Sequence, residues 1–271
     1  MAYTIAIAGK GGTGKTTLAA LIIHHLLKAH GRPVLAVDAD PNANLNEALG
    51  VEYVRSVIDT IDRFMGGKEQ LPAGVAKGRY LEYQIESALF ESKGFDMLVM
   101  GRTEGPGCYC YANDLLRGLL DRLSDNYRYV VIDNEAGMEH LSRRTTRNVD
   151  TLLITAVPTV SALRSAARIH RTALELDLNI HKTFLVINEP NERPISTDEK
   201  AGMEEVDLTK INPAVHREIS SLQGSGLPLL GIIPFDYNIL ERSIEAKGLM
   251  DLPDDSPVLE TVARIVEKIL A

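Results

Sequence analysis

The sequence predicts a single α/β domain in which a mostly parallel β-sheet carries helices on both faces. Short, almost wholly apolar runs recur along the 271 residues, and segments with helical spacing separate them. The first apolar run leads directly into a glycine-rich loop, which an amphipathic helix follows. Continuous apolar strands that alternate with helices are typical of a parallel sheet whose two faces are both covered.

Seven strands are expected from the apolar runs, with helices between them. The helix after the first strand is predicted from the spacing of Leu18, Leu21, Ile22 and Leu26. No linker, low-complexity tract or repeat divides residues 1–271, so we expect one domain. The predicted strands are Tyr3–Ala8, Val34–Asp38, Asp96–Gly101, Tyr129–Asp133, Thr151–Ala156, Lys182–Asn188 and Leu229–Ile233.

Two stretches fit this alternation poorly and are predicted to be family-specific insertions. Residues 53–94 are polar and punctuated by glycine, with a helical piece expected around Leu81–Phe90. Residues 190–226 combine proline, serine and charge, and we expect an exposed segment that contains a helix. Irregular segments of this kind often carry contacts that differ between relatives.

The composition excludes several classes of protein. Charged residues make up 24% of the chain and apolar residues 45%, as in a globular protein rather than a disordered or fibrous one. No apolar run is long enough to span a bilayer and no basic-then-apolar leader opens the chain, so a cytoplasmic protein is expected. The net charge of −8 has the wrong sign for broad attraction to nucleic acid or anionic lipid, so neither partner is predicted.

The segment Gly9–Thr17 matches the phosphate-binding pattern G-x-x-x-x-G-K-[ST] between a strand and a helix. Its glycines let the backbone aim N–H groups at phosphate oxygens, and the following helix adds the positive end of its dipole. Lys15 supplies a cation for the β- and γ-phosphates, and the Thr16 hydroxyl is placed to bind Mg²⁺. The predicted nucleotide-binding residues of this loop are Gly9, Gly11, Gly12, Thr13, Gly14, Lys15, Thr16 and Thr17.

A second lysine, Lys10, directly follows Gly9, which makes this the deviant form of the phosphate-binding loop. With this loop the sequence resembles the dimeric ATPases that include MinD, ParA, nitrogenase iron protein and the metal-insertion ATPases. The resemblance implies ATP and Mg²⁺ as cofactors and a homodimer as the active form. It also implies that Lys10 has a catalytic role across the dimer interface, at the partner's nucleotide. A solvated loop residue is the alternative for Lys10.

Acidic residues follow two further predicted strands, at the edge where parallel sheets bind their ligands. Asp133 is placed like the acid that holds the Mg²⁺ shell. By the resemblance, Asp40 orients or deprotonates the attacking water, and Asp38 supports the metal shell or the loop around Asp40. Gly137 would offer a backbone N–H to the γ-phosphate. Helix capping or turn formation is the alternative for each aspartate, but their joint position beside the phosphate-binding loop favours catalysis.

The adenine base is expected beside two other strand ends, again from the resemblance. Asn188 ends one predicted strand, and Pro234 lies in the segment GIIPFD at Gly231–Asp236. The family usually has lysine after this asparagine, whereas this chain has Glu189. A strand-ending proline without a ligand is the alternative for Pro234.

The two cysteines, Cys108 and Cys110, stand in a loop after Gly105–Gly107 and before a predicted helix that begins near Asn113. Thiols just before a helix N-terminus have a lowered pKa, so thiolates are favoured. A soft divalent ion normally takes four such ligands, and a two-fold symmetric dimer would supply the second pair. Two small buried residues or a strained local disulfide are the alternatives.

The chain resembles one branch of the family more closely. The segments GKGGTGKTT, VDADPN, GCYC and DNEAGMEHL are similar to the CooC-type nickel-insertion ATPases and their sister branch, AcsF. These proteins serve the maturation of carbon monoxide dehydrogenase or acetyl-CoA synthase, which are therefore the implied client enzymes. The resemblance implies that ATP drives dimerisation and that one Ni²⁺ lies on Cys108 and Cys110 of both subunits. Zn²⁺ is the alternative occupant of that site.

Two other functions stay open at this point. Four cysteines at a dimer axis can also hold an iron–sulfur cluster, as in a carrier or a nitrogenase-iron-protein-like ATPase, although those proteins space their cysteines more widely. A spatial organiser of the MinD or ParA type needs a basic amphipathic tail or a basic DNA-binding face. The segment Pro257–Ala271 has an apolar stripe and a polar face of mixed charge, which predicts packing on the core.

Overall fold

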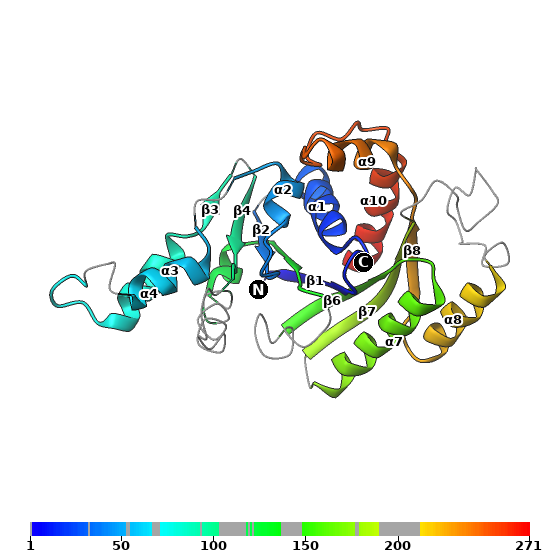
Figure 1. The fold of residues 1–271 in the computed structure, drawn as a ribbon, viewed down its shortest axis with the longest axis horizontal. Helices are drawn as coiled ribbons and strands as arrows, with labels where there is room; N and C mark the ends of the chain where they lie inside the picture. The colour runs from blue at the N-terminus through cyan, green and yellow to red at the C-terminus, as the bar shows by residue number, and fades with distance from the viewer. Residues whose placement is uncertain are drawn as a thin grey trace.

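A twisted β-sheet forms the centre of the molecule (Figure 1). The computed structural model describes residues 2–31, 33–52, 55–66, 71–92, 94–102, 118, 120, 122–136, 148–176, 179–189 and 212–271. Eight strands lie in the order β3-β4-β2-β5-β1-β6-β7-β8 within these residues, and every neighbouring pair is parallel except β3 and β4. The strands are β1 (Tyr3–Gly9), β2 (Val34–Asp38), β3 (Phe90–Glu91), β4 (Phe95–Val99), β5 (Tyr129–Asp133), β6 (Asn148–Ala156), β7 (Asn179–Asn188) and β8 (Leu229–Ile233).

Helices cover both faces of the sheet, which confirms the predicted fold class (Figure 1). One face carries α1 (Lys15–His25) with its π-helical extension (Leu26–His30), α2 (Leu45–Leu49), α9 (Tyr237–Ile244) and α10 (Pro257–Leu270). The opposite face carries α7 (Val160–Glu175) and α8 (Pro213–Gly224). Helices α3 (Val57–Met65) and α4 (Lys77–Glu86) pack against each other beside the β3–β4 edge.

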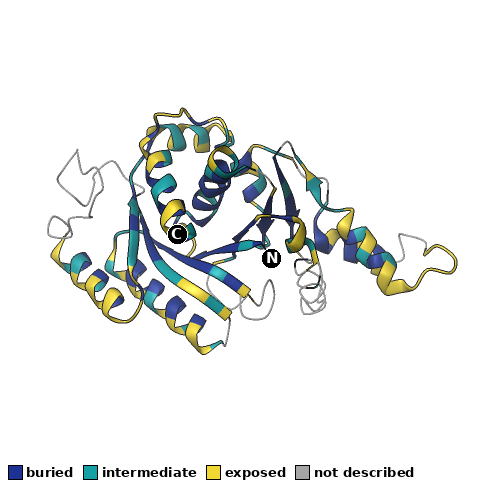
Figure 2. Ribbon diagram, turned by 180° about the vertical axis from the view of Figure 1, so that it is seen from behind, coloured by how far each residue is buried: buried dark blue, intermediate teal, exposed yellow. Residues whose placement is uncertain are grey.

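The strands bury both of their faces, because successive side chains point into two separate apolar cores. Ile5 and Ile7 of β1 join the core beneath α1 and α10, whereas Ala6 and Ala8 join the core beneath α7. Figure 2 shows the central strands as buried ribbon between the two helical layers. This double burial explains the uninterrupted apolar runs in the sequence.

The helix predicted near the C-terminus is α10, and its apolar stripe packs on the core as expected. The stripe is fully or almost fully buried against α1 and β8, and it consists of Val258, Val262, Ile265, Val266 and Ile269. The amphipathic pattern of α10 is therefore satisfied inside the protein. None of the helices in the described ranges is long and apolar enough to cross a membrane.

The structure differs from the predicted elements at several boundaries. β6 and β7 each begin three residues earlier than predicted, because two of the three added residues in each strand are polar and interrupt the apolar run. The helix expected around Leu81–Phe90 is α4 and ends at Glu86, while Phe90 belongs to the short strand β3. The helix expected within residues 190–226 is α8, whose apolar side packs against α7. That both stretches are family-specific insertions stays a prediction.

Candidate nucleotide-binding site

The loop after β1 needs its glycines for two different reasons. Gly12 and Gly14 have φ angles of 79° and 83°, a left-handed conformation that side chains with a Cβ rarely adopt. At Gly9 a Cβ would overlap Thr155 of β6, and at Gly14 it would overlap the Asn188 amide. Around Gly12, in contrast, an added Cβ would meet nothing within 4 Å, so this part of the loop faces open space. The backbone at Gly11 and Gly12 is exposed and free to approach a ligand.

Thr13 and Thr155 brace the loop from within. The Thr13 hydroxyl donates to the Lys10 carbonyl oxygen at 2.8 Å and lies 2.8 Å from the Thr155 hydroxyl, while the Thr13 N–H also reaches that carbonyl at 3.3 Å. Thr155 in turn donates to the Ala8 carbonyl oxygen at 3.2 Å. The backbone of Lys10 is thereby fixed, whereas its side chain is exposed. Thr155 was missed by the sequence analysis, although it is a polar residue within an otherwise apolar strand.

The N-terminus of α1 presents a positive end to this loop. Gly14 caps the helix without a side-chain hydrogen bond, and no acidic residue occupies the first turn. The orphan N–H groups of that turn and the helix dipole therefore favour an anion. Lys15 begins the helix and is only 7% exposed, and Thr17 is half-buried beside it. A buried lysine ammonium group needs a negatively charged hydrogen-bond partner, and a phosphate oxygen at the start of the helix would supply one.

Asp38 and Asp133 end two adjacent strands and lie opposite each other in the register of β2 and β5. Burial raises the pKa of Asp38 to about 7, and the nearby charge of Asp133 adds to the rise. Burial also raises the pKa of Asp133 to about 6, although the hydrogen bond from Thr16 and the charge of Lys15 oppose the shift. Two crowded carboxyl groups in this setting favour a cation nearby.

The carboxyl group of Asp38 braces the segment that carries Asp40. The backbone N–H of Asp40 donates to Asp38 Oδ1 at 3.1 Å, and that of Leu45 donates to Asp38 Oδ2 at 2.8 Å. Asp40 is partly exposed and accepts from the backbone and side-chain amides of Asn42 at 2.8 and 3.0 Å. Of the two roles predicted for Asp38, this geometry matches support of the loop around Asp40.

The residues at the start of α1 and the end of β5 fit a Mg²⁺ ion. Thr16 Oγ1 donates to Asp133 Oδ2 at 2.6 Å. Asp133 Oδ1 is buried, and within the described part of the chain it has no hydrogen-bond partner. A hydroxyl and a carboxylate are the hard oxygen donors that Mg²⁺ prefers, and its water shell would reach the unpaired oxygen.

A cavity of about 210 Å³ lies between the start of α1, the end of β7, the segment after β8 and α9. Asn188 and Pro234, the two residues predicted to frame adenine, both line this cavity. The Asn188 amide also donates to the Thr13 carbonyl oxygen at 3.3 Å, which ties the end of β7 to the phosphate-binding loop. Glu189 and Phe235 line the same cavity, and Phe235 belongs to the segment Gly231–Asp236 that was expected near adenine, whereas Glu189 was not predicted as a contact. A flat, partly polar ring fits such a lining.

A second buried polar residue was also missed. Asn134 follows Asp133, is 2% exposed, and donates from its amide to the Ile7 carbonyl oxygen at 2.9 Å. It ties the end of β5 to β1, next to the phosphate-binding loop. Its position between two acidic residues gave no signal of burial.

Cys108, Cys110 and Gly137 lie outside the described residues, as do the residues 138–140 that follow Gly137. The metal site on the cysteines and the γ-phosphate contact of Gly137 therefore stay predictions.

We expect Asp38→Asn to change how stability depends on pH in the nucleotide-free protein. The pKa of Asp38 is about 7 in the folded state and ordinarily 3.8. As the pH rises, the Asp38 carboxyl group therefore loses its proton in the unfolded chain before it does so in the folded chain. The parent protein therefore loses stability as the pH rises from about 4 to about 7, and the neutral amide does not. Urea unfolding at pH 4 and pH 8 should show the variant gaining roughly 3–4 kcal/mol on the parent between the two pH values. If variant and parent differed by the same free energy of unfolding at pH 4 and at pH 8, Asp38 would not be a buried, protonated carboxyl group.

Comparison with known proteins identifies related sequences and structures. The model of the CobQ/CobB/MinD/ParA nucleotide binding domain matches residues 4–249. An uncharacterized ATP-binding protein of Methanocaldococcus jannaschii is 38% identical over 269 residues, which cover 98% of each chain. The carbon monoxide dehydrogenase accessory protein CooC of Rhodospirillum rubrum is 36% identical over 185 residues, 64% of this chain and 70% of that protein. Among solved structures, MinD of Aquifex aeolicus has a TM-score of 0.66 at 22% identity, covering 99% and 97% of the two chains.

Proposed function

Since the chain belongs to the CobQ/CobB/MinD/ParA family of nucleotide-binding domains, we propose that it is a homodimeric, Mg²⁺-dependent ATPase that inserts nickel. In this proposal Cys108 and Cys110 of two subunits bind one Ni²⁺ at the dimer interface. The client enzyme is carbon monoxide dehydrogenase or acetyl-CoA synthase. The observation that carries the proposal is the 36% identity to CooC, joined to a cysteine pair in the loop before a predicted helix.

In this proposal, different described residues bind the phosphates, the base, Mg²⁺ and the attacking water. Lys15 and the loop N–H groups hold the β- and γ-phosphates, and Asn188 and Pro234 border the base. Thr16 and Asp133 would hold Mg²⁺, which neutralises charge on the phosphates when it is bound. Asp40 positions the attacking water and takes its proton.

The dimer gives the exposed Lys10 a function. Its backbone is fixed by Thr13 while its side chain extends to the surface beside the loop. In the dimer this cation reaches the phosphates of the partner's nucleotide, where it stabilises the charge of the transition state. ATP bound between two subunits then sets the distance between their cysteine pairs, which links nucleotide state to metal affinity.

The Asp40→Asn variant tests the hydrolytic part of the proposal. The amide keeps an acceptor for Asn42 but cannot take a proton, so hydrolysis should fall by about a hundredfold. ATP affinity should stay within about twofold, and ATP-bound dimers should accumulate because hydrolysis no longer ends them. Asp255→Asn, the same change at an exposed residue, is the matched control. An Asp40→Asn protein that hydrolyses ATP at the parental rate would exclude this role.

The two alternative functions make different predictions. A MinD-like organiser would bind membranes or DNA with ATP, but the apolar stripe of α10 is buried in the core and unavailable to a lipid surface. An iron–sulfur carrier would be brown after anaerobic purification and rich in iron and sulfide. We expect neither iron nor sulfide in stoichiometric amounts, and metal analysis of the anaerobic protein decides between nickel handling and cluster transfer.

A further inference from the structure

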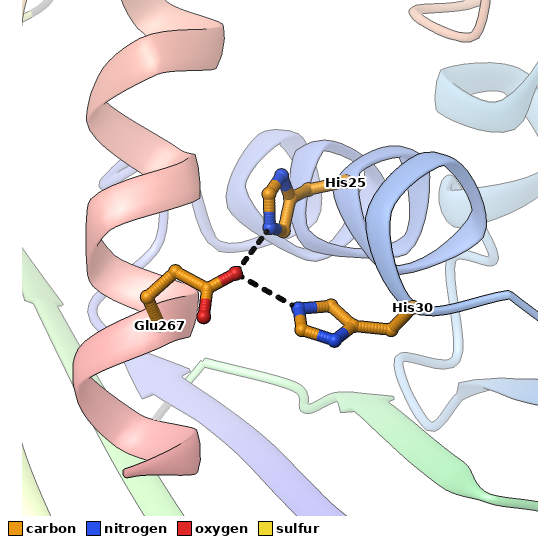
Figure 3. A group of neighbouring side chains, drawn as sticks. All are labelled: His25, His30 and Glu267. Atoms are coloured by element: carbon orange, nitrogen blue, oxygen red, sulfur yellow. Dashed lines mark hydrogen bonds and ion pairs between the residues drawn. The ribbon is translucent and has the colours of Figure 1, made fainter.

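Three potential metal ligands meet at the end of α1 that lies away from the phosphate-binding loop. His25 ends α1, His30 ends its π-helical extension, and Glu267 comes from α10 (Figure 3). Glu267 Oε1 lies 3.0 Å from His30 Nε2 and 3.6 Å from His25 Nε2. One ligand atom from each residue lies within 4.8 Å of the other two.

The π-helical turn is what brings the two histidines together. At 3.6 residues per turn, positions five apart point to different sides of an α-helix. Residues 26–30 instead form a π-helix, whose wider turn places His25 and His30 on the same side, with ring centres 5.6 Å apart. π-Helical turns are rare in proteins, and many of those that occur lie at functional sites.

The separations suit a metal ion better than they suit hydrogen bonds alone. Glu267 and His30 are within hydrogen-bond distance, but 3.6 Å is too long for a hydrogen bond between Glu267 and His25. His25 Nε2 is buried and has no hydrogen-bond partner among the described residues. Two ligands bound to one ion at about 2.0–2.1 Å with tetrahedral angles lie roughly 3.3 Å apart, close to both separations.

The surroundings leave the site ready to accept a cation. Lys28, which lies between His25 and His30 in the sequence, pairs with Asp254 rather than with Glu267. The Glu267 side chain is 59% exposed, so an ion can enter from solvent and keep a water as a further ligand.

We propose that His25, His30 and Glu267 form a metal site that binds one divalent transition-metal ion per chain, independently of Cys108 and Cys110. Two imidazoles and one carboxylate suit ions of borderline softness such as Zn²⁺ and Ni²⁺. The ion joins residues separated by 237 positions in the sequence and fastens α10 to the end of α1. It thereby stabilises the fold at the end of α1 that lies away from the phosphate-binding loop.

The test uses the full chain with Cys108→Ser and Cys110→Ser, without nucleotide, and Zn²⁺ as the probe. Equilibrium dialysis should find one Zn²⁺ per chain, and zinc at a hundredfold excess over its Kd should raise Tm by roughly 5 °C. Adding Glu267→Gln should lower zinc affinity on the order of a hundredfold and abolish the Tm shift. Glu260→Gln, the same change on α10 at a residue that pairs with Arg264, is the control and should leave both unchanged.

Folding does not confound this comparison, because Glu267 is largely exposed and its variant should match the parent's Tm without zinc. His30→Gln provides a second loss of one ligand. A cysteine-free protein that binds no zinc would overturn the proposal, and so would equal zinc affinity with and without Glu267→Gln. Neither result bears on nickel at the cysteines, which are absent from the tested protein.

Discussion

Lys15→Ala should abolish ATP hydrolysis and nearly abolish ATP binding. Lys15 is 7% exposed at the start of α1, directly after the loop that we propose holds the phosphates. Removing one partner of a buried, charged hydrogen bond costs about 2–5 kcal/mol, so ATP affinity should fall roughly a hundredfold to a thousandfold. Hydrolysis should fall by about three orders of magnitude or more, since this charge is most important in the transition state. Fluorescent ATP binding and phosphate release measure the two effects.

The matched control for this variant is Lys28→Ala. Lys28 lies on the π-helical extension of the same helix, is exposed, and pairs with Asp254 at the surface. Exposed ion pairs of this kind contribute little, so the control should keep parental binding and hydrolysis. If Lys15→Ala bound ATP as tightly as the control, the loop would not be the phosphate site.

The combined Cys108→Ser and Cys110→Ser variant should lose nickel from the dimer interface while it still binds ATP. Thiolate ligation of Ni²⁺ produces charge-transfer absorption in the near ultraviolet, which distinguishes this site from one made of histidine and carboxylate. The parent should titrate to one thiolate-bound Ni²⁺ per two chains, and the variant should show no such band. ATP affinity should be unchanged, because the phosphate-binding loop contains neither cysteine.

Glu267→Gln serves as the control for the cysteine variant. It alters the other proposed metal site and leaves both cysteines in place, so the thiolate band should persist. A band of parental strength in the cysteine variant would refute the assigned ligands.

The fold and the grouping of residues at the candidate nucleotide site were largely predictable because both depend on local sequence patterns. Buried parallel strands must be apolar on both faces, so the seven longer strands appear as continuous runs. Gly12 and Gly14 adopt positive φ angles, for which glycine is suited, in the loop whose glycines were expected to let the backbone curl. Asp38 and Asp133 lie side by side because parallel strands bring their carboxyl ends to one edge.

Other features depend on tertiary contacts that no local pattern records. The two-residue strand β3 forms by pairing with β4 and has too few residues to show a period. His25 and His30 share a side only because residues 26–30 form a π-helix, which a period of 3.6 does not predict. Thr155 contacts Thr13 of the phosphate-binding loop, and Asn134 donates to Ile7 of β1 beside that loop. Both contacts join residues far apart in the sequence, so they became visible only in the folded chain.

Size-exclusion chromatography with inline metal analysis, run on the Glu267→Gln protein, tests the central proposal most directly. With ATP and Ni²⁺ together, we expect the chain to elute as a dimer that carries one Ni²⁺ per two chains and the thiolate absorption band. A protein that elutes as a monomer under every combination of ATP, ADP and Ni²⁺ would contradict nickel binding between two subunits.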